Sequence, residues 1–137
     1  MTNTMVRPLK CTFPQAGSWK AFVFDFPFWG FAAKQAKIFL RCLKQRPEDM
    51  TSEYAEQCKQ ISDVLGRECG MKPLPIVSND DFLALLWIVD RYGSSAEEFL
   101  MGLEERFGKP LPEIDYKKAT VGDFIATISA STQELIR

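Results

Sequence analysis

The sequence predicts an all-α protein, built as a four-helix bundle with an additional amphipathic helix on its N-terminal side. Three observations lead to this prediction. Apolar residues recur every three or four positions along most of the chain, polar residues that cap helices precede these stretches, and glycine or proline follows them. The 137 residues include 46% hydrophobic and 26% charged residues, which is typical of a folded globular protein and leaves no room for a second full domain.

Charge divides the chain into two parts. Residues 1–50 carry eight Lys or Arg against three Asp or Glu, a net charge of +5, whereas residues 51–137 carry nine against fifteen, a net charge of −6. We therefore expect an N-terminal extension with a basic helix over residues 1–50 and an acidic helical bundle over residues 51–137. The asymmetry indicates either that the two parts attract each other or that the first part binds an anionic surface.

The N-terminal extension is expected to contain one helix, from about Phe28 to Gln45. Before it, residues 1–18 are predicted to be irregular, and the alternating residues 19–26 are compatible with a short strand or with an extended lead-in. Asp25 and Pro27 are typical of a helix start. On this helix one stripe is basic and lies opposite Trp, Phe and Leu side chains: Lys34, Lys37, Arg41 and Lys44.

That basic stripe has three interpretations. It is compatible with the solvated face of a helix packed on a protein core, with a helix lying on an anionic membrane surface, and with a contact surface for another protein. A transmembrane span is not expected, because the apolar run before Lys34 is too short.

The next helix is predicted to begin at Pro47 or Thr51 and to end at Cys69, with Gly70 as its terminator. A proline-containing loop, residues 71–79, should follow it.

Asn79 or Asp80 is then expected to cap a short helix whose residues 82–89 are apolar on every side. We expect this helix to pack between the bundle and the N-terminal helix. The alternative is that Trp87 and Ile88 form a partner surface or a dimer seam.

The stretch GSSAEEFLMGLEERFG, residues 93–108, predicts the central helix. Ser94 and Ser95, each three residues before a glutamate, should form two overlapping capping boxes, and Gly108 should end the helix. One stripe is apolar and should be buried: Ala96, Phe99, Leu100, Leu103 and Phe107. The opposite side is acidic around a methionine and is a candidate docking face for a basic protein partner: Glu97, Glu98, Met101, Glu104 and Glu105.

The last helix should follow a loop over residues 109–118 that contains one turn near Asp115. Thr120 and Asp123 form a further capping box. The apolar stripe behind them predicts a helix that packs on the bundle: Val121, Phe124, Ile125 and Ile128.

Residues 93–108 resemble the second helix of acyl carrier proteins, which starts at the serine that bears phosphopantetheine. The preceding LGRECGMKPLPIVSNDDF resembles the end of the carriers' first helix and the loop behind it, and ATVGDFIATI resembles their last helix. The resemblance covers about residues 51–130. It is closest to small uncharacterised enterobacterial carrier-like proteins in which Gly and two polar residues precede Ala-Glu-Glu-Phe. It implies a carrier-like bundle with an acidic helix that partner proteins contact.

The sequence departs from the carriers at the modification site. Carriers have Asp-Ser-Leu at the helix start, and a gap-free alignment places Gly93 at the serine position, so that Ser94 reaches it only with a shift of one residue. We therefore interpret the chain as a non-enzymatic carrier-like interaction module without a prosthetic group. One alternative is a carrier modified with phosphopantetheine at Ser94 or Ser95, and a second is a peripheral protein at a membrane surface.

The sequence contains no motif typical of a metal-binding protein, a nucleophilic enzyme, a nucleotide-binding protein or a nucleic-acid-binding protein. The chain has no histidine, and its four cysteines, at positions 11, 42, 58 and 69, show no metal-ligand spacing, so neither a zinc site nor a Ser-His or Cys-His nucleophile is expected. There is no phosphate-binding glycine motif, and the basic residues are too few for nucleic-acid binding. No cleavable signal peptide is evident, which predicts a cytoplasmic protein with reduced thiols. The oligomeric state stays open.

Overall fold

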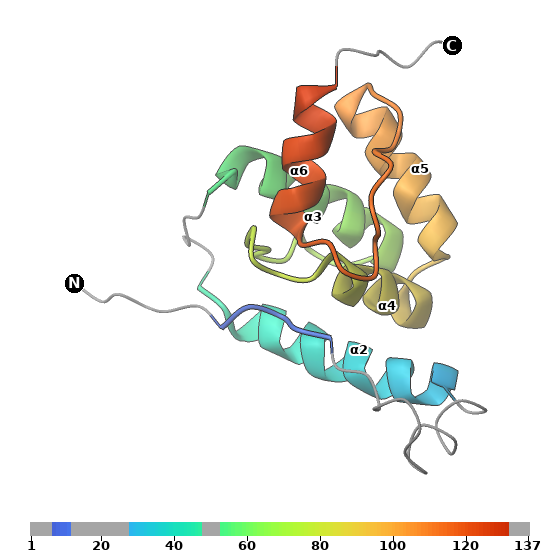
Figure 1. The fold of residues 1–137 in the computed structure, drawn as a ribbon. Helices are drawn as coiled ribbons and strands as arrows, with labels where there is room; N and C mark the ends of the chain where they lie inside the picture. Colours follow the sequence, from blue (N-terminus) through green and yellow to red (C-terminus); the bar gives the residue numbers. More distant parts are fainter. Residues whose placement is uncertain (1–6, 12–27, 48–52, 132–137) are drawn as a thin grey trace.

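The computed structural model describes residues 7–11, 28–47 and 53–131, and this part of the chain forms five helices and no strand (Figure 1). The all-α class is therefore confirmed for these residues. The expected strand or lead-in at residues 19–26 and the helix start at Asp25 and Pro27 lie outside them. The helices are α2 (Phe28–Gln45), α3 (Ala55–Cys69), α4 (Phe82–Tyr92), α5 (Ala96–Phe107) and α6 (Val121–Ala130).

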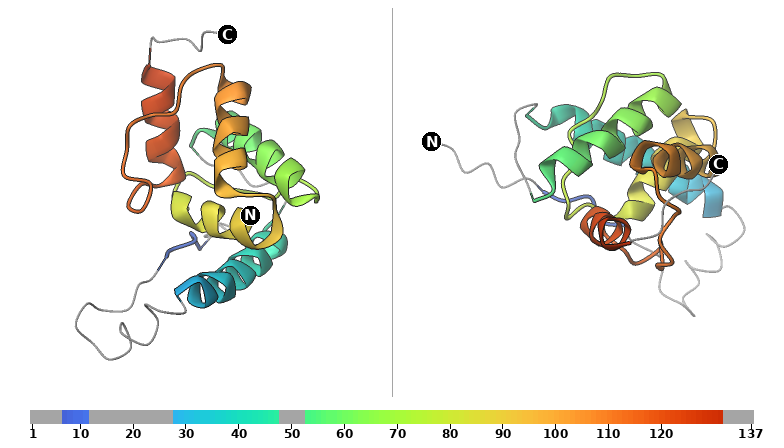
Figure 2. Two further views of the ribbon diagram at one scale, coloured as in Figure 1. Left: turned by 90° about the vertical axis from the view of Figure 1, so that its right-hand side faces the viewer. Right: turned by 90° about the horizontal axis from the view of Figure 1, so that it is seen from above.

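Helix α4 lies between α2 and the remaining helices, as the sequence predicted. It packs along α2 on one side and contacts α3 and α5 on the other (Figures 1 and 2). Phe39 of α2 stacks on Trp87 of α4 with ring centroids 6.2 Å apart. Trp87 and Ile88 are thus buried inside the molecule, and the alternative that they form a partner surface or dimer seam is wrong.

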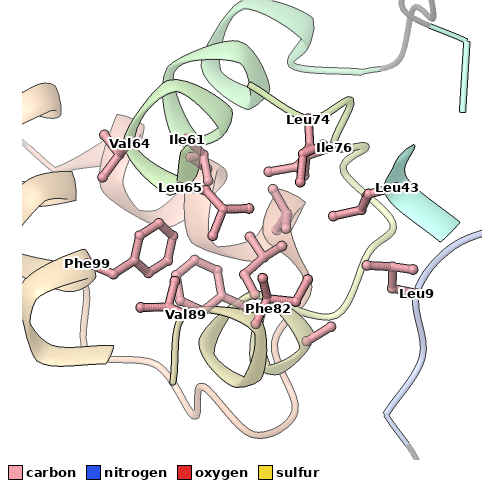
Figure 3. Packing of buried hydrophobic residues seen from close by; sticks show 14 of the residues in the cluster. Leu9, Leu43, Ile61, Val64, Leu65, Leu74, Ile76, Phe82, Val89 and Phe99 are labelled. Atoms are coloured by element: carbon pink, nitrogen blue, oxygen red, sulfur yellow. The ribbon is translucent and has the colours of Figure 1, made fainter. Parts of the chain in front are cut away.

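One hydrophobic core joins all five helices. Phe82, at the start of α4, is fully buried and stacks on Phe124 of α6 with centroids 4.8 Å apart, while Phe99 of α5 lies 6.2 Å away. Figure 3 shows the same cluster reaching from Phe99 to Leu43 of α2 and Leu9 of the N-terminal segment. The division of the chain into residues 1–50 and 51–137 stays a prediction, although the two parts share this core.

Helix α3 begins later than predicted. Pro47 is not helical, and Tyr54 precedes the helix in the left-handed conformation, with φ 59° and ψ 38°, which a continuous α-helix does not contain. The predicted end is confirmed. Gly70 has φ 65°, and its N–H and that of Met71 donate to carbonyls of the last turn of α3.

Asp80 does not cap α4, contrary to the sequence-based prediction, because its carboxylate is used elsewhere. The residue is fully buried, and both carboxylate oxygens accept hydrogen bonds from the guanidinium of Arg46, at 2.7 Å each. The backbone N–H of Leu9 donates to the same carboxylate at 2.8 Å and that of Val77 at 3.0 Å. Four donors therefore compensate the buried charge.

The N-cap of α4 is Asp81, whose carboxylate also faces the N-terminal segment. It accepts from the backbone N–H of Cys11 at 2.8 Å and from the Lys10 ammonium at 3.3 Å, and no hydrogen bond joins it to its own helix. Asn79, the other predicted cap, is exposed.

We predict that Arg46→Met lowers the free energy of unfolding by about 3–5 kcal/mol, because it leaves the Asp80 carboxylate buried without its counter-charge. Urea unfolding followed by circular dichroism measures the change. Lys44→Met is the matched control, since Lys44 is exposed in the last turn of α2, two residues before Arg46, and its loss should cost less than about 0.5 kcal/mol. A loss below about 1 kcal/mol for Arg46→Met would contradict this account of the pair.

Candidate functional site

The start of α5 has one capping serine. Ser95 is the N-cap, in extended conformation, and its hydroxyl accepts from the backbone N–H of Glu98 at 3.1 Å. Ser94 is exposed, and its hydroxyl donates to the Glu68 carboxylate of α3 at 2.8 Å. The prediction of two overlapping capping boxes is therefore wrong for Ser94, because a helix has a single N-cap position and Ser95 occupies it. For Ser95 it holds in part, since its hydroxyl caps the helix but the Glu98 side chain does not accept from the Ser95 N–H in return.

Gly93 is tightly packed, and a side chain there would require its neighbours to shift by a few tenths of an ångström. A Cβ atom there would lie 3.0 Å from the carbonyl oxygen of Glu68 and 3.1 Å from that of Val89. Backbone atoms of α3 and α4 thus crowd the position that a gap-free alignment equates with the carriers' modified serine. A hydroxyl that could carry a prosthetic group at this helix start must come from Ser94 or Ser95.

The inner side of α5 fits the prediction and adds one residue to it. Phe99 and Leu103 are buried, and the other three predicted stripe residues are half-buried. Gly102 is also buried, and a Cβ atom there would lie 2.9 Å from both Val64 Cγ1 and Arg67 Nη2 of α3. This close approach holds α5 firmly against α3 and could not be read from the periodicity of α5.

The outer side of α5 carries the acidic face, which we define as Glu97, Glu98, Met101 and Glu105. All four residues are exposed, and the Met101 side chain is 61% accessible to solvent. Glu104 was expected among them but is half-buried, and its carboxylate accepts from the backbone N–H of Leu111 at 3.2 Å. Glu104 therefore positions the loop after α5 and does not belong to the exposed face.

The outer side of α2 carries the basic face, which we define as Lys34, Lys37, Ile38, Arg41 and Lys44. All five residues are exposed, whereas the opposite side of the helix is buried against α4. Ile38, 50% exposed, was not singled out from the sequence. Its position on a helical wheel, 40° from Lys34 and 60° from Arg41, is the sequence signal that places it on the basic face.

The thiols with raised pKa values are poor nucleophiles. Burial, together with the nearby Asp81 carboxylate, raises the pKa of Cys11 to about 12, although Lys10 opposes the shift. Burial and Glu68 likewise raise the pKa of Cys69. Since the thiolate is the reactive form, both groups stay protonated near neutral pH.

Within residues 7–11, 28–47 and 53–131, no cluster of three or more His, Cys, Asp or Glu is placed to hold a metal ion. No helix of these ranges is both long and apolar enough to cross a membrane.

We predict that Ser95→Ala destabilises the protein by about 1 kcal/mol, because it removes the hydroxyl that accepts from Glu98 N–H at the start of α5. Ser94→Ala is the matched comparison and should cost less than about 0.5 kcal/mol, since its hydrogen bond to Glu68 is exposed. Urea unfolding of both variants tests this. Equal losses, or a larger loss for Ser94→Ala, would contradict the assignment of Ser95 as the cap.

The structure brings four of the five predicted docking residues onto one exposed face and places the two serines at one end of the same helix. The predicted basic stripe lies on a separate helix. Comparisons of this chain with protein-family models, with curated proteins and with solved structures found no match.

Proposed function

We propose that this protein is a non-enzymatic, carrier-like interaction module, in which the acidic face of α5 binds a protein partner that carries a basic patch. One observation carries the proposal: Met101 is 61% exposed in the middle of the acidic face, on a helix whose other side is fixed in the core. A large apolar side chain ringed by carboxylates offers a partner both an apolar contact and a charge complementary to a basic patch.

Helix α5 is held rigidly, which favours recognition. Ser95 caps its first turn, Gly108 ends it with φ 67°, and Gly102 allows close contact with α3. A rigid face loses little conformational entropy on binding. The flexible Met101 side chain adapts to an apolar pocket, and the carboxylates around it steer a basic partner into place.

The proposal includes no prosthetic group. Gly93 stands at the modified position, and neither nearby serine lies within an Asp-Ser-Leu sequence. The hydroxyl of Ser95 is moreover engaged as a helix cap. In this proposal the surface of α5 itself, and no tethered arm, supplies the recognition.

We predict that Glu97→Lys with Glu98→Lys weakens partner capture about tenfold or more, because the reversed charges repel a basic patch. The measurement is quantitative mass spectrometry of proteins retained from the native host by the immobilised full chain, with wild type and variant compared. Glu56→Lys with Glu113→Lys is the matched control, since both residues are exposed, lie outside α5 and give the same change in net charge. Equal retention of every protein by both variants would refute this role of the acidic face.

The alternative function, a phosphopantetheine carrier, is supported by one observation: the Ser94 hydroxyl is exposed at the start of α5. Intact-mass measurement after co-expression with a broad-specificity phosphopantetheinyl transferase separates the two functions. We predict an unmodified mass. A phosphopantetheine-sized increase that Ser94→Ala removes and Ser95→Ala retains would instead assign the protein as a carrier.

A further inference from the structure

We propose that the partner of the acidic face is the basic face of α2 on a second copy of this chain, so that the protein associates head to tail. This inference rests on the proposed function, because it names the partner of the docking face on α5.

The two faces have matching designs. On α5, Met101 lies four residues after Glu97, three after Glu98 and four before Glu105, so carboxylates flank it on both sides. On α2, Ile38 lies in the same relation to cations, as it follows Lys34 by four residues and precedes Arg41 by three. Each face therefore has an apolar centre with a rim of a single charge sign, and the two signs are opposite.

Each face exposes one large apolar side chain that a contact between the two faces would bury. Among the described residues whose exposure is known, Ile38 and Met101 are the large hydrophobic side chains that are exposed, at 50% and 61%. Each sits at the middle of one of the two charged faces. Contact between the faces would remove both side chains from water and would pair the surrounding charges.

The acidic face and the basic face cannot contact each other within one molecule. Helix α4 lies between α2 and α5 in Figure 1 and in the left view of Figure 2, and the basic face points away from α4 because the opposite side of α2 is packed on it. A contact between two different surfaces is heterologous, and it builds a ring or an open chain of copies. The contact area of two single helix faces is small, which predicts weak, salt-sensitive association.

The test is sedimentation equilibrium of the full chain at about 0.03 M and about 0.5 M NaCl, where the screening length differs roughly fourfold. At low salt the average mass of wild type should rise above 15.6 kDa with protein concentration, and at high salt it should stay at that value. Lys37→Glu with Arg41→Glu should abolish the rise, and Glu97→Lys with Glu98→Lys should do the same. Circular dichroism confirms that the variants are folded.

Mixing the two reversed variants gives the sharpest result. Each variant keeps one face as in wild type: the acidic face in Lys37→Glu with Arg41→Glu, and the basic face in Glu97→Lys with Glu98→Lys. The mixture therefore again offers one pair of opposite faces, and association should return as a pair of copies without growth to longer chains. Lys117→Glu with Lys118→Glu is the matched control, because these exposed lysines lie outside α2 and their reversal should leave association unchanged. Ile38→Ser should weaken association without any change of charge.

Three results would overturn the inference. They are a wild type that stays at 15.6 kDa under all conditions, association that either reversal leaves unchanged, and a monomer that binds phosphatidylglycerol-containing vesicles through Lys37 and Arg41. A monomer whose acidic face still retains a host protein would refute self-association alone. A Glu97→Lys with Glu98→Lys variant that behaves as wild type in both assays would refute the proposed function as well.

Discussion

The buried ion pair between Asp80 and Arg46 is the constraint on which the rest of this structure depends. A carboxylate with no solvent exposure loses its hydration entirely, and the fold must replace that hydration with hydrogen bonds from fixed positions. The donors come from the end of α2, from the N-terminal segment at Leu9 and from the loop at Val77. The carbonyl of Asp80 also accepts from the N–H of Val121 at the start of α6. One residue thereby joins four separate segments, while the apolar side of α2 that packs on α4 sets which side of this helix faces outward.

The features that could be predicted from the sequence are those whose causes are local. Gly70 and Gly108 end their helices in the left-handed conformation, and Thr120 with Asp123 forms the predicted reciprocal cap, because the interacting groups lie within a few residues of one another. Asp80 was assigned by the same local logic and wrongly. Its side-chain partners include residues 34 and 71 positions away, and no periodicity or capping pattern reports a contact over that separation.

In the candidate site, too, the predictions that depend on local causes are correct and those that involve distant contacts are wrong. Glu97, Glu98 and Met101 were placed on the exposed side of α5 by helical periodicity alone, since exposure there depends only on which side is apolar. Glu104 and Ser94 were misplaced because each meets a group from another part of the chain, the N–H of Leu111 and the carboxylate of Glu68. A helical wheel gives the direction in which a side chain leaves its own helix. It contains no information on loops or other helices that contact that side chain.

The charge asymmetry of the chain was compatible with attraction between its two parts or with binding of the first part to an anionic surface, and the structure contains contacts of the first kind. Within the described ranges, Lys10 and Arg46 of the basic part form ion pairs with Asp81 and Asp80 of the acidic part, so attraction between the two parts does contribute to the fold. The remaining cations of α2 stay on its outer surface. With a net charge of −1, two copies of this chain repel each other little as whole molecules, and the separated faces then decide their mutual orientation. Internal pairing thus engages Arg46 and Lys10, and the exposed cations of α2 form a basic surface opposite in sign to the outer face of α5.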